Sequence, residues 1–155
     1  MSAFTPAMKS FINAERFAVI GRVLTDRTRW DNKVLRWYQA HDLPVTPVKP
    51  GGGSGESVED VQILSEPTAL PDLPSTSISV IIHPSLGLGI LKSLYPTPPA
   101  PAEPRGIWFQ PGAESDEIRA YAKQRGIEDR VVAGGQCILK QGDALMGERK
   151  VGAKM

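Results

Sequence analysis

The first half of the chain alternates between short apolar runs and amphipathic stretches. Residues 17–21 (Phe-Ala-Val-Ile-Gly) form an apolar run of strand length that ends in glycine, as is typical of a strand buried on both faces. A helix is expected from about Asp31 to His41, followed by a second strand over 45–48. The pattern therefore predicts a strand–helix–strand unit near the start of the chain.

The second half continues the alternation. We expect three further strands, over 77–82, 106–110 and 130–133, because each is a short apolar or β-branched run bounded by turn residues. The expected helices between them are 86–94, capped by Ser85, and 115–125, closed by Gly126. Strands that alternate with helices of this length predict a parallel sheet with helices on both faces.

The remaining segments are expected to be peripheral. Thr5-Pro6 is a good helix start, so residues 1–14 should form a short helix packed on the main domain, 15–141. Residues 51–55 and 95–104 should be loops, the first rich in glycine and the second containing five prolines. A brief apolar piece at 61–64, a turn or one-turn helix at 68–73 and a polar, frayed tail over 142–155 complete the prediction.

The charge and cysteine content of the chain exclude some classes of ligand and binding partner. A formal net charge of +1 gives no reason to expect nucleic acid or an anionic membrane as a partner, and no apolar run approaches the ~20 residues of a spanning helix. The single Cys137 excludes an internal disulfide and a cysteine-based zinc cluster. We expect a cytoplasmic protein. A mitochondrial presequence is the weaker alternative, because Lys9 is the only basic residue before Arg16.

The ends of the predicted strands carry the candidate chemistry. Gly21, Lys49, His83 and Gln110 each lie at the carboxyl end of a predicted strand, and the carboxyl ends of parallel strands meet at one edge, where ligands bind. A strand that stops at glycine and leads into a helix presents backbone N–H groups to a phosphate. A simple tight turn at Gly21 is the alternative.

Four cations surround the first of these turns: Arg22, Arg27, Arg29 and Lys33. Such a charge run is often only a solvated surface. A lysine in the first turn of a helix opposes the helix dipole, however, and an anionic ligand would explain the position of Lys33.

The type of nucleotide is partly constrained. The turn after Gly21 lacks the other glycines of a dinucleotide fingerprint, and Lys49 stands where an acidic residue would bind the ribose of NAD. The sequence therefore disfavours NAD and leaves CoA and NADP open, since both carry a phosphate on the ribose. The glycine run at 51–55 lacks the GK[ST] ending of a Walker A loop.

These segments resemble a known family, the stand-alone CoA-binding domains, which are small Rossmann-like proteins similar to the CoA-binding domain of the succinyl-CoA synthetase alpha subunit. The resemblance covers roughly residues 15–141. The matching pieces are Asn32-Lys33-Val34-Leu35-Arg36-Trp37-Tyr38, Val45-Thr46-Pro47-Val48-Lys49-Pro50, His83-Pro84, the turn Trp108-x-Gln110-x-Gly112, and Cys137-Ile138-Leu139-Lys140.

The resemblance implies a single Rossmann-like domain, with a parallel sheet of about five strands, that binds CoA. By this resemblance, Gly21, Arg22 and Val23 would approach the pyrophosphate. Arg29, Asn32 and Lys33 would flank the pyrophosphate, and Lys49 and Pro50 would border the adenosine or 3′-phosphate side. The pantetheine path would be lined by His83, Pro84, Gln110, Pro111 and Gly112. This chain departs from the pattern at Lys49, where the family has asparagine, in a slightly longer first loop, and in the proline-rich insertion at 96–104.

No ordered set of nucleophile, base and oxyanion donors is visible. His83 fits a structural or ligand-lining group better than a general base, and Cys137 is either a small buried residue or a thiol near the pantetheine end. We therefore expect non-catalytic binding of CoA or an acyl-CoA by a carrier, sensor or regulatory protein. The alternatives are an NADP-dependent oxidoreductase and a nucleotide-free scaffold that docks through its proline-rich loop. A homodimer is compatible with each of them.

Overall fold

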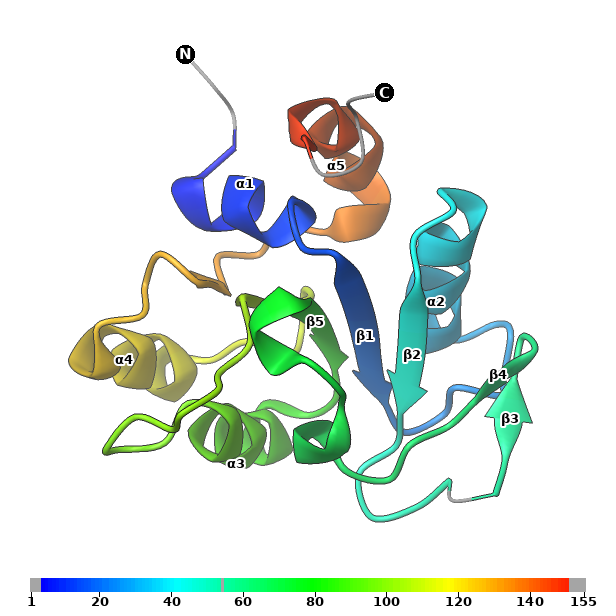
Figure 1. Cartoon of the computed structure of the whole chain (residues 1–155), viewed down its shortest axis with the longest axis horizontal. Helices are drawn as coiled ribbons and strands as arrows, with labels where there is room; N and C mark the ends of the chain where they lie inside the picture. Colours follow the sequence, from blue (N-terminus) through cyan, green and yellow to red (C-terminus); the bar gives the residue numbers. More distant parts are fainter. Residues whose placement is uncertain (1–3, 54, 151–155) are drawn as a thin grey trace.

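The computed structural model describes residues 4–53 and 55–150. Its centre is a five-stranded sheet in which every neighbouring pair is parallel, with the strand order β2-β1-β5-β6-β7 (Figure 1). The strands are β1 (Arg16–Gly21), β2 (Val45–Val48), β5 (Thr76–Ile81), β6 (Gly106–Phe109) and β7 (Val131–Val132). The predicted fold class, an α/β domain of this kind, is confirmed.

Helices cover both faces of the sheet. One face is covered by α1 (Pro6–Ile12), α2 (Trp30–Ala40) and α5 (Ile138–Leu145), and the other by α3 (Pro84–Leu94) and α4 (Asp116–Arg125). Strand β1 shows why both faces must be covered. Phe17 and Val19 belong to the core cluster under α1 and α2, whereas Ala18 and Ile20 belong to the cluster under α3 and α4, because successive side chains of a strand point to opposite faces.

The amino-terminal helix packs on the sheet, as the sequence predicts. The Thr5 hydroxyl caps α1 by accepting the Met8 N–H at 3.2 Å, and Phe11 is fully buried edge-on against Trp108, with the ring centroids 5.3 Å apart. Figure 1 shows α1 and α5 side by side above the amino-terminal end of β1. Residues 1–3 lie outside the described part of the chain.

A small antiparallel hairpin was not predicted from the sequence. Its strands are β3 (Ser57–Val58) and β4 (Val61–Gln62), and its turn residues Glu59 and Asp60 both have positive φ, 48° and 67°. Two single-turn 3-10 helices, Pro67–Ala69 and Leu73–Ser75, occupy the region where we expected a turn or one-turn helix. The hairpin lies beside the carboxyl ends of β1 and β2 (Figure 1).

Two local predictions are wrong. Helix α3 is capped by His83 and not by Ser85: the imidazole Nδ1 accepts the Ser85 N–H at 3.1 Å, and Pro84 takes the first helical position. The expected fraying from Gly142 is also wrong for residues 142–148. Helix α5 continues through Gly142, which is buried, to Leu145, and a 3-10 turn (Met146–Glu148) follows. Residues 151–155 lie outside the described part.

The proline-rich segment is a loop, as predicted, but both of its ends are anchored. The Tyr95 hydroxyl donates to the Pro104 carbonyl at 2.8 Å, and the Arg125 guanidinium donates to the Pro96 carbonyl at 2.8 Å and pairs with Glu103. The prolines between these anchors are largely exposed.

Candidate functional site

The carboxyl ends of four strands meet at one edge of the sheet. Pairing aligns Ile20 of β1 with Val48 of β2, Gly21 with Ile81 of β5, and Val80 with Phe109 of β6. The residues that follow these positions therefore lie along the same edge, and they include Arg22, Lys49, His83 and Gln110. The chain leaves β1 toward β2 on one side, whereas β5 lies on the other side, so the strand order reverses between β1 and β5. Ligands of open α/β sheets bind at such a switch point.

At Gly21 the structure places a carboxylate. A Cβ added to Gly21 would lie 2.2 Å from Asp31 Oδ2 and 2.5 Å from Asp31 Cβ. The same Oδ2 accepts the Val23 N–H at 2.9 Å, and Oδ1 accepts the Asn32 N–H at 2.8 Å. The absence of a side chain at Gly21 is therefore explained by Asp31, without a phosphate.

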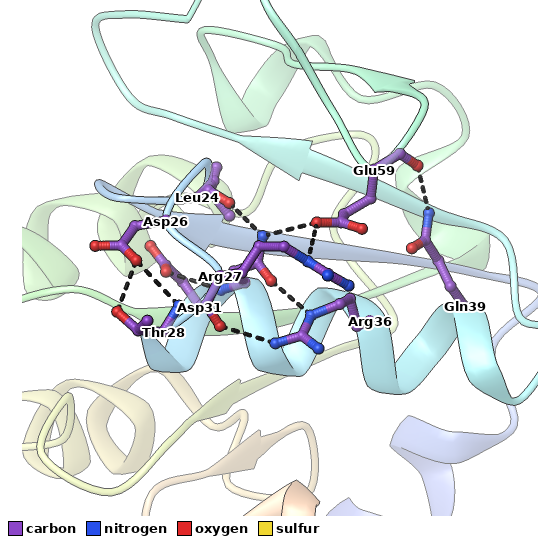
Figure 2. A network of polar contacts seen from close by, with 9 residues as sticks. Leu24, Asp26, Arg27, Thr28, Asp31, Arg36, Gln39 and Glu59 are labelled. Carbon is purple, nitrogen blue, oxygen red and sulfur yellow. Dashed lines mark hydrogen bonds and ion pairs between the residues drawn. The ribbon is translucent and has the colours of Figure 1, made fainter.

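The loop between β1 and α2 is tied together by a polar network that reaches the β3–β4 hairpin (Figure 2). The Glu59 carboxylate accepts from Arg27 at 3.1 Å and from the Asn32 amide at 3.2 Å, and the Glu59 carbonyl accepts from Gln39 at 2.9 Å. Asn32 is fully buried and also donates to the Leu24 carbonyl, while its own oxygen accepts from Arg36. Arg27 and Asn32 thus hold the loop in shape, which sequence reasoning missed because Glu59 lies in the unpredicted hairpin.

The other cations at this edge of the sheet do not take part in the loop network. Among residues 4–53 and 55–150, Arg22, Arg29, Lys33 and Lys49 form no ion pair. The Lys33 ammonium lies 4.8 Å from the centre of the Trp30 ring, so an indole and a charge are presented together at the start of α2. Lys49 is half-buried, and its aliphatic stem lies against Gly52. Pro50 follows it at the start of the glycine-rich segment.

Two carboxylates sit among these cations in different environments. Burial raises the pKa of Asp31, which is only 1% exposed, although the hydrogen bonds from Val23 and Asn32 oppose this effect. The exposed Asp26 accepts both the hydroxyl and the N–H of Thr28, and these bonds lower its pKa (Figure 2). Of these two carboxylates, only Asp31 is therefore buried at this edge.

A cavity of about 640 Å³ opens at the same edge, between the start of α2, the end of β6 and the segment from β7 to α5. Its volume is in the range of sites for small molecules and cofactors. The lining residues are Trp30, Val34, Gln110, Pro111, Gly134, Gly135, Gln136, Cys137, Leu139, Lys140 and Gln141. The sequence had placed Gln110 and Pro111 on the ligand path and had named Cys137 as a possible thiol near its end. The other lining residues were not expected as site residues.

The walls of this cavity are held by hydrogen bonds between distant elements. The buried Gln110 side chain accepts the Ile138 N–H at 2.9 Å, which fixes the start of α5. The Trp108 indole donates to the Gln136 carbonyl at 2.9 Å. Gly112 has a φ of +93° in the turn beyond Pro111, and Cys137 is partly exposed on the wall. Hydrogen bonds within the protein thus hold the walls of the cavity in place.

In the described part of the chain, three large apolar side chains are exposed, and all three lie at this edge. Val23 is 42% exposed, Trp30 62% and Leu86 46%. Val23 and Trp30 come from the loop after β1 and the start of α2, and Leu86 from the first turn of α3 after β5. The two loops that flank the switch point therefore offer apolar contacts to a ligand.

His83 is less available for chemistry than its position suggests. Its Nδ1 faces both the Ser85 N–H and the Ser85 hydroxyl, the latter at 2.8 Å, and Pro84 begins the helix behind it. In the described ranges no carboxylate pairs with His83, and no group of three His, Cys, Asp or Glu residues could hold a metal ion. No helix in these ranges is long and apolar enough to cross a membrane.

Comparison with solved structures supports the fold. A hypothetical protein from Pyrococcus furiosus matches with a TM-score of 0.64 and 25% identity, over 82% of this chain and 98% of its own. A hypothetical protein from Pyrococcus horikoshii gives a TM-score of 0.71 at 18% identity, covering 94% of both chains. A protein of Thermus thermophilus gives 0.69 at 24% identity, over 88% of this chain and 93% of its own.

A search of curated proteins finds no match. The family model described as CoA binding domain matches residues 15–143, which include the whole sheet, helices α2, α3 and α4, and every site residue described above. The chain therefore belongs to the CoA binding domain family.

Proposed function

We propose that this protein binds CoA or an acyl-CoA at the carboxyl edge of its sheet and acts as a carrier, sensor or regulatory module without catalysing a reaction. The observation that carries the proposal is the combination, at one edge of the sheet, of a cavity of about 640 Å³ with cations that form no ion pair among the described residues. A ligand with a charged diphosphate end and a long, weakly polar arm matches both features.

The arrangement suggests how such a ligand would lie. Arg22, Lys33 and Lys49 would meet its phosphates, since ammonium and guanidinium groups are the usual phosphate partners in proteins. The exposed Trp30 indole would take the adenine by stacking. The pantetheine arm would then enter the cavity past Gln110 toward Cys137.

A binding role also agrees with the state of the reactive groups. His83 Nδ1 faces both the N–H and the hydroxyl of Ser85 in the cap of α3, and among the described residues no carboxylate pairs with the ring to orient it as a general base. Cys137 has no basic partner in the described contacts that would activate it. Tight, reversible binding is the chemistry that remains.

Replacing Lys33 or Lys49 by alanine is expected to weaken CoA binding by roughly fivefold to tenfold each, because each variant removes one charge-assisted contact to phosphate. The measurement is calorimetric titration, preceded by thermal-shift screening against CoA, acetyl-CoA, NADP, NAD and ATP, in which the true ligand raises the melting temperature with concentration. Lys123→Ala, on the exposed side of α4, is the matched control.

Other results of the thermal-shift screen would favour other functions. A selective response to NADP would favour an oxidoreductase, and no response to any nucleotide would favour a scaffold. If CoA binds equally well to both lysine variants and to the control, the phosphates lie somewhere else.

Bound CoA is expected to protect Cys137 from alkylation, because the pantetheine arm would cover the thiol in the cavity wall. We expect the rate with iodoacetamide to fall at least about fivefold at saturating CoA, since alkylation requires an accessible thiolate. Adenosine 3′,5′-diphosphate, which lacks the pantetheine, should occupy the cations without protecting the thiol. Equal rates with and without CoA would place the arm outside this cavity.

A further inference from the structure

The feature of interest is the Asp31 carboxylate, which is buried against the turn where a phosphate was expected. It accepts the Val23 N–H at 2.9 Å and the Asn32 N–H at 2.8 Å, and it covers Gly21. Backbone amides at the start of a helix that follows a glycine turn are the groups that hold phosphates in nucleotide-binding sheets. Here they are already taken by a side chain of the same chain.

We infer that Asp31 is a specificity-determining residue that occupies the amides of the β1–α2 turn and keeps the phosphates of an anionic ligand on the outer cations. The inference rests on the proposed function for the identity of the ligand. The inference goes beyond the proposed function, since binding of CoA at this edge does not by itself require a negative charge at Gly21.

The location of the carboxylate explains why it stays in place without a ligand. Asp31 lies in the first turn of α2, where the helix dipole favours a negative charge, and the Arg29 guanidinium acts on it in the same sense. The other charged or titratable groups around it are Arg22, Asp26, Arg27 and Lys33 on the same loop and helix, Glu59 in the β3–β4 hairpin, and Lys49 and His83 after the neighbouring strands. A phosphate that reached the turn would have to displace the carboxylate or lie against it.

Removal of this negative charge should therefore tighten the binding of anions. In Asp31→Asn and Asp31→Ser the charge is gone, and Ser also empties part of the space at Gly21. The difference from the wild-type chain should shrink at lower pH, because burial raises the pKa of Asp31 and protonation then removes the same charge in the wild type. The titration of the phosphates of CoA is common to all variants and cancels in the ratio.

The test is calorimetric titration of the full chain and both variants with CoA and with inorganic pyrophosphate, at pH 7.5 and pH 5.5. We expect CoA to bind at least about tenfold more tightly to the variants at pH 7.5, with a smaller ratio at pH 5.5, and pyrophosphate to gain affinity in the same order. Asp26→Asn is the matched control, since it removes an exposed carboxylate of the same loop that does not touch these amides. Thermal unfolding verifies that each variant is folded.

The outcomes separate the two proposals. If CoA binds all variants with equal affinity, or if Asp26→Asn tightens binding as much as the Asp31 variants, the inference is overturned and the proposed function stands. If CoA binds none of them while pyrophosphate binds Asp31→Ser more tightly than the wild type, the proposed function fails and the inference stands. If neither probe binds any variant, both are wrong.

Discussion

Replacing Gly142 by alanine is expected to lower the free energy of unfolding by about 3 kcal/mol, at the upper end of what overpacking costs. The added Cβ would lie 2.3 Å from Cζ2 and 2.8 Å from Cε2 of the Trp37 indole. That ring has little room to retreat. It packs edge-on against Tyr38, lies 4.2 Å from the His41 ring, and donates its N–H to Asp143 at 2.9 Å. Helix α5 would therefore have to move away from α2.

The measurement is urea unfolding followed by tryptophan fluorescence and circular dichroism. The matched control is Gly89→Ala in α3, where an added Cβ meets nothing within 4 Å. That change should stabilise the protein by roughly 0.5–1 kcal/mol, since glycine is a poor helix former. The same substitution thus has opposite signs in two helices. A Gly142→Ala variant as stable as the wild type would show that α5 does not pack on Trp37.

Gly21→Ala is expected to cost about 2–3 kcal/mol of stability, because the new Cβ would overlap both the carboxylate and the Cβ of Asp31. The overlap with Asp31 Cβ, at 2.5 Å, is the important one. It means that shortening Asp31 to alanine leaves a clash, whereas Asp31→Gly removes it. The substitution at Gly21 should therefore be much less costly in an Asp31→Gly background than in an Asp31→Ala background.

A double-mutant cycle measures this difference by comparing urea midpoints of the single and double variants. We expect an interaction energy of about 2 kcal/mol with Asp31→Gly and little with Asp31→Ala. Asp31→Gly alone will itself destabilise α2, since it loses two hydrogen bonds to backbone amides, and the cycle corrects for that loss. Equal costs in both backgrounds would mean that Gly21 is needed for another reason.

Most of the candidate edge could be located from the sequence. Apolar runs of strand length followed by Gly21, Lys49, His83 and Gln110 were enough, because a parallel sheet necessarily places the carboxyl ends of its strands together. The hydrogen-bond partners of individual side chains at this edge could not be predicted from the sequence pattern. Asn32, which was expected beside the pyrophosphate, has its amide in the loop network and is fully buried, and the sequence pattern did not predict this network.

The reason is that polar partners are chosen by three-dimensional proximity and not by pattern. Arg27 meets Glu59 because the β3–β4 hairpin folds back over α2 (Figure 2), and the sequence around Glu59 carries too few apolar residues to predict a hairpin of two-residue strands. Gly142 was assigned to a polar tail because only a helix packed against Trp37 explains why a glycine belongs there.

The sequence by itself determined the parallel sheet, its two helical layers and the edge at which a ligand would bind, since these follow from the period of apolar residues and from glycine and proline at element ends. Only the tertiary structure decided that Asp31 covers Gly21, that Glu59 of the hairpin binds Arg27 and Asn32, and that a cavity lies beside Cys137. The alternation of buried and exposed positions within one helix or strand can be read from the spacing of apolar residues in the sequence. Contacts between elements depend on how those elements pack, and packing joins residues that the pattern leaves unrelated.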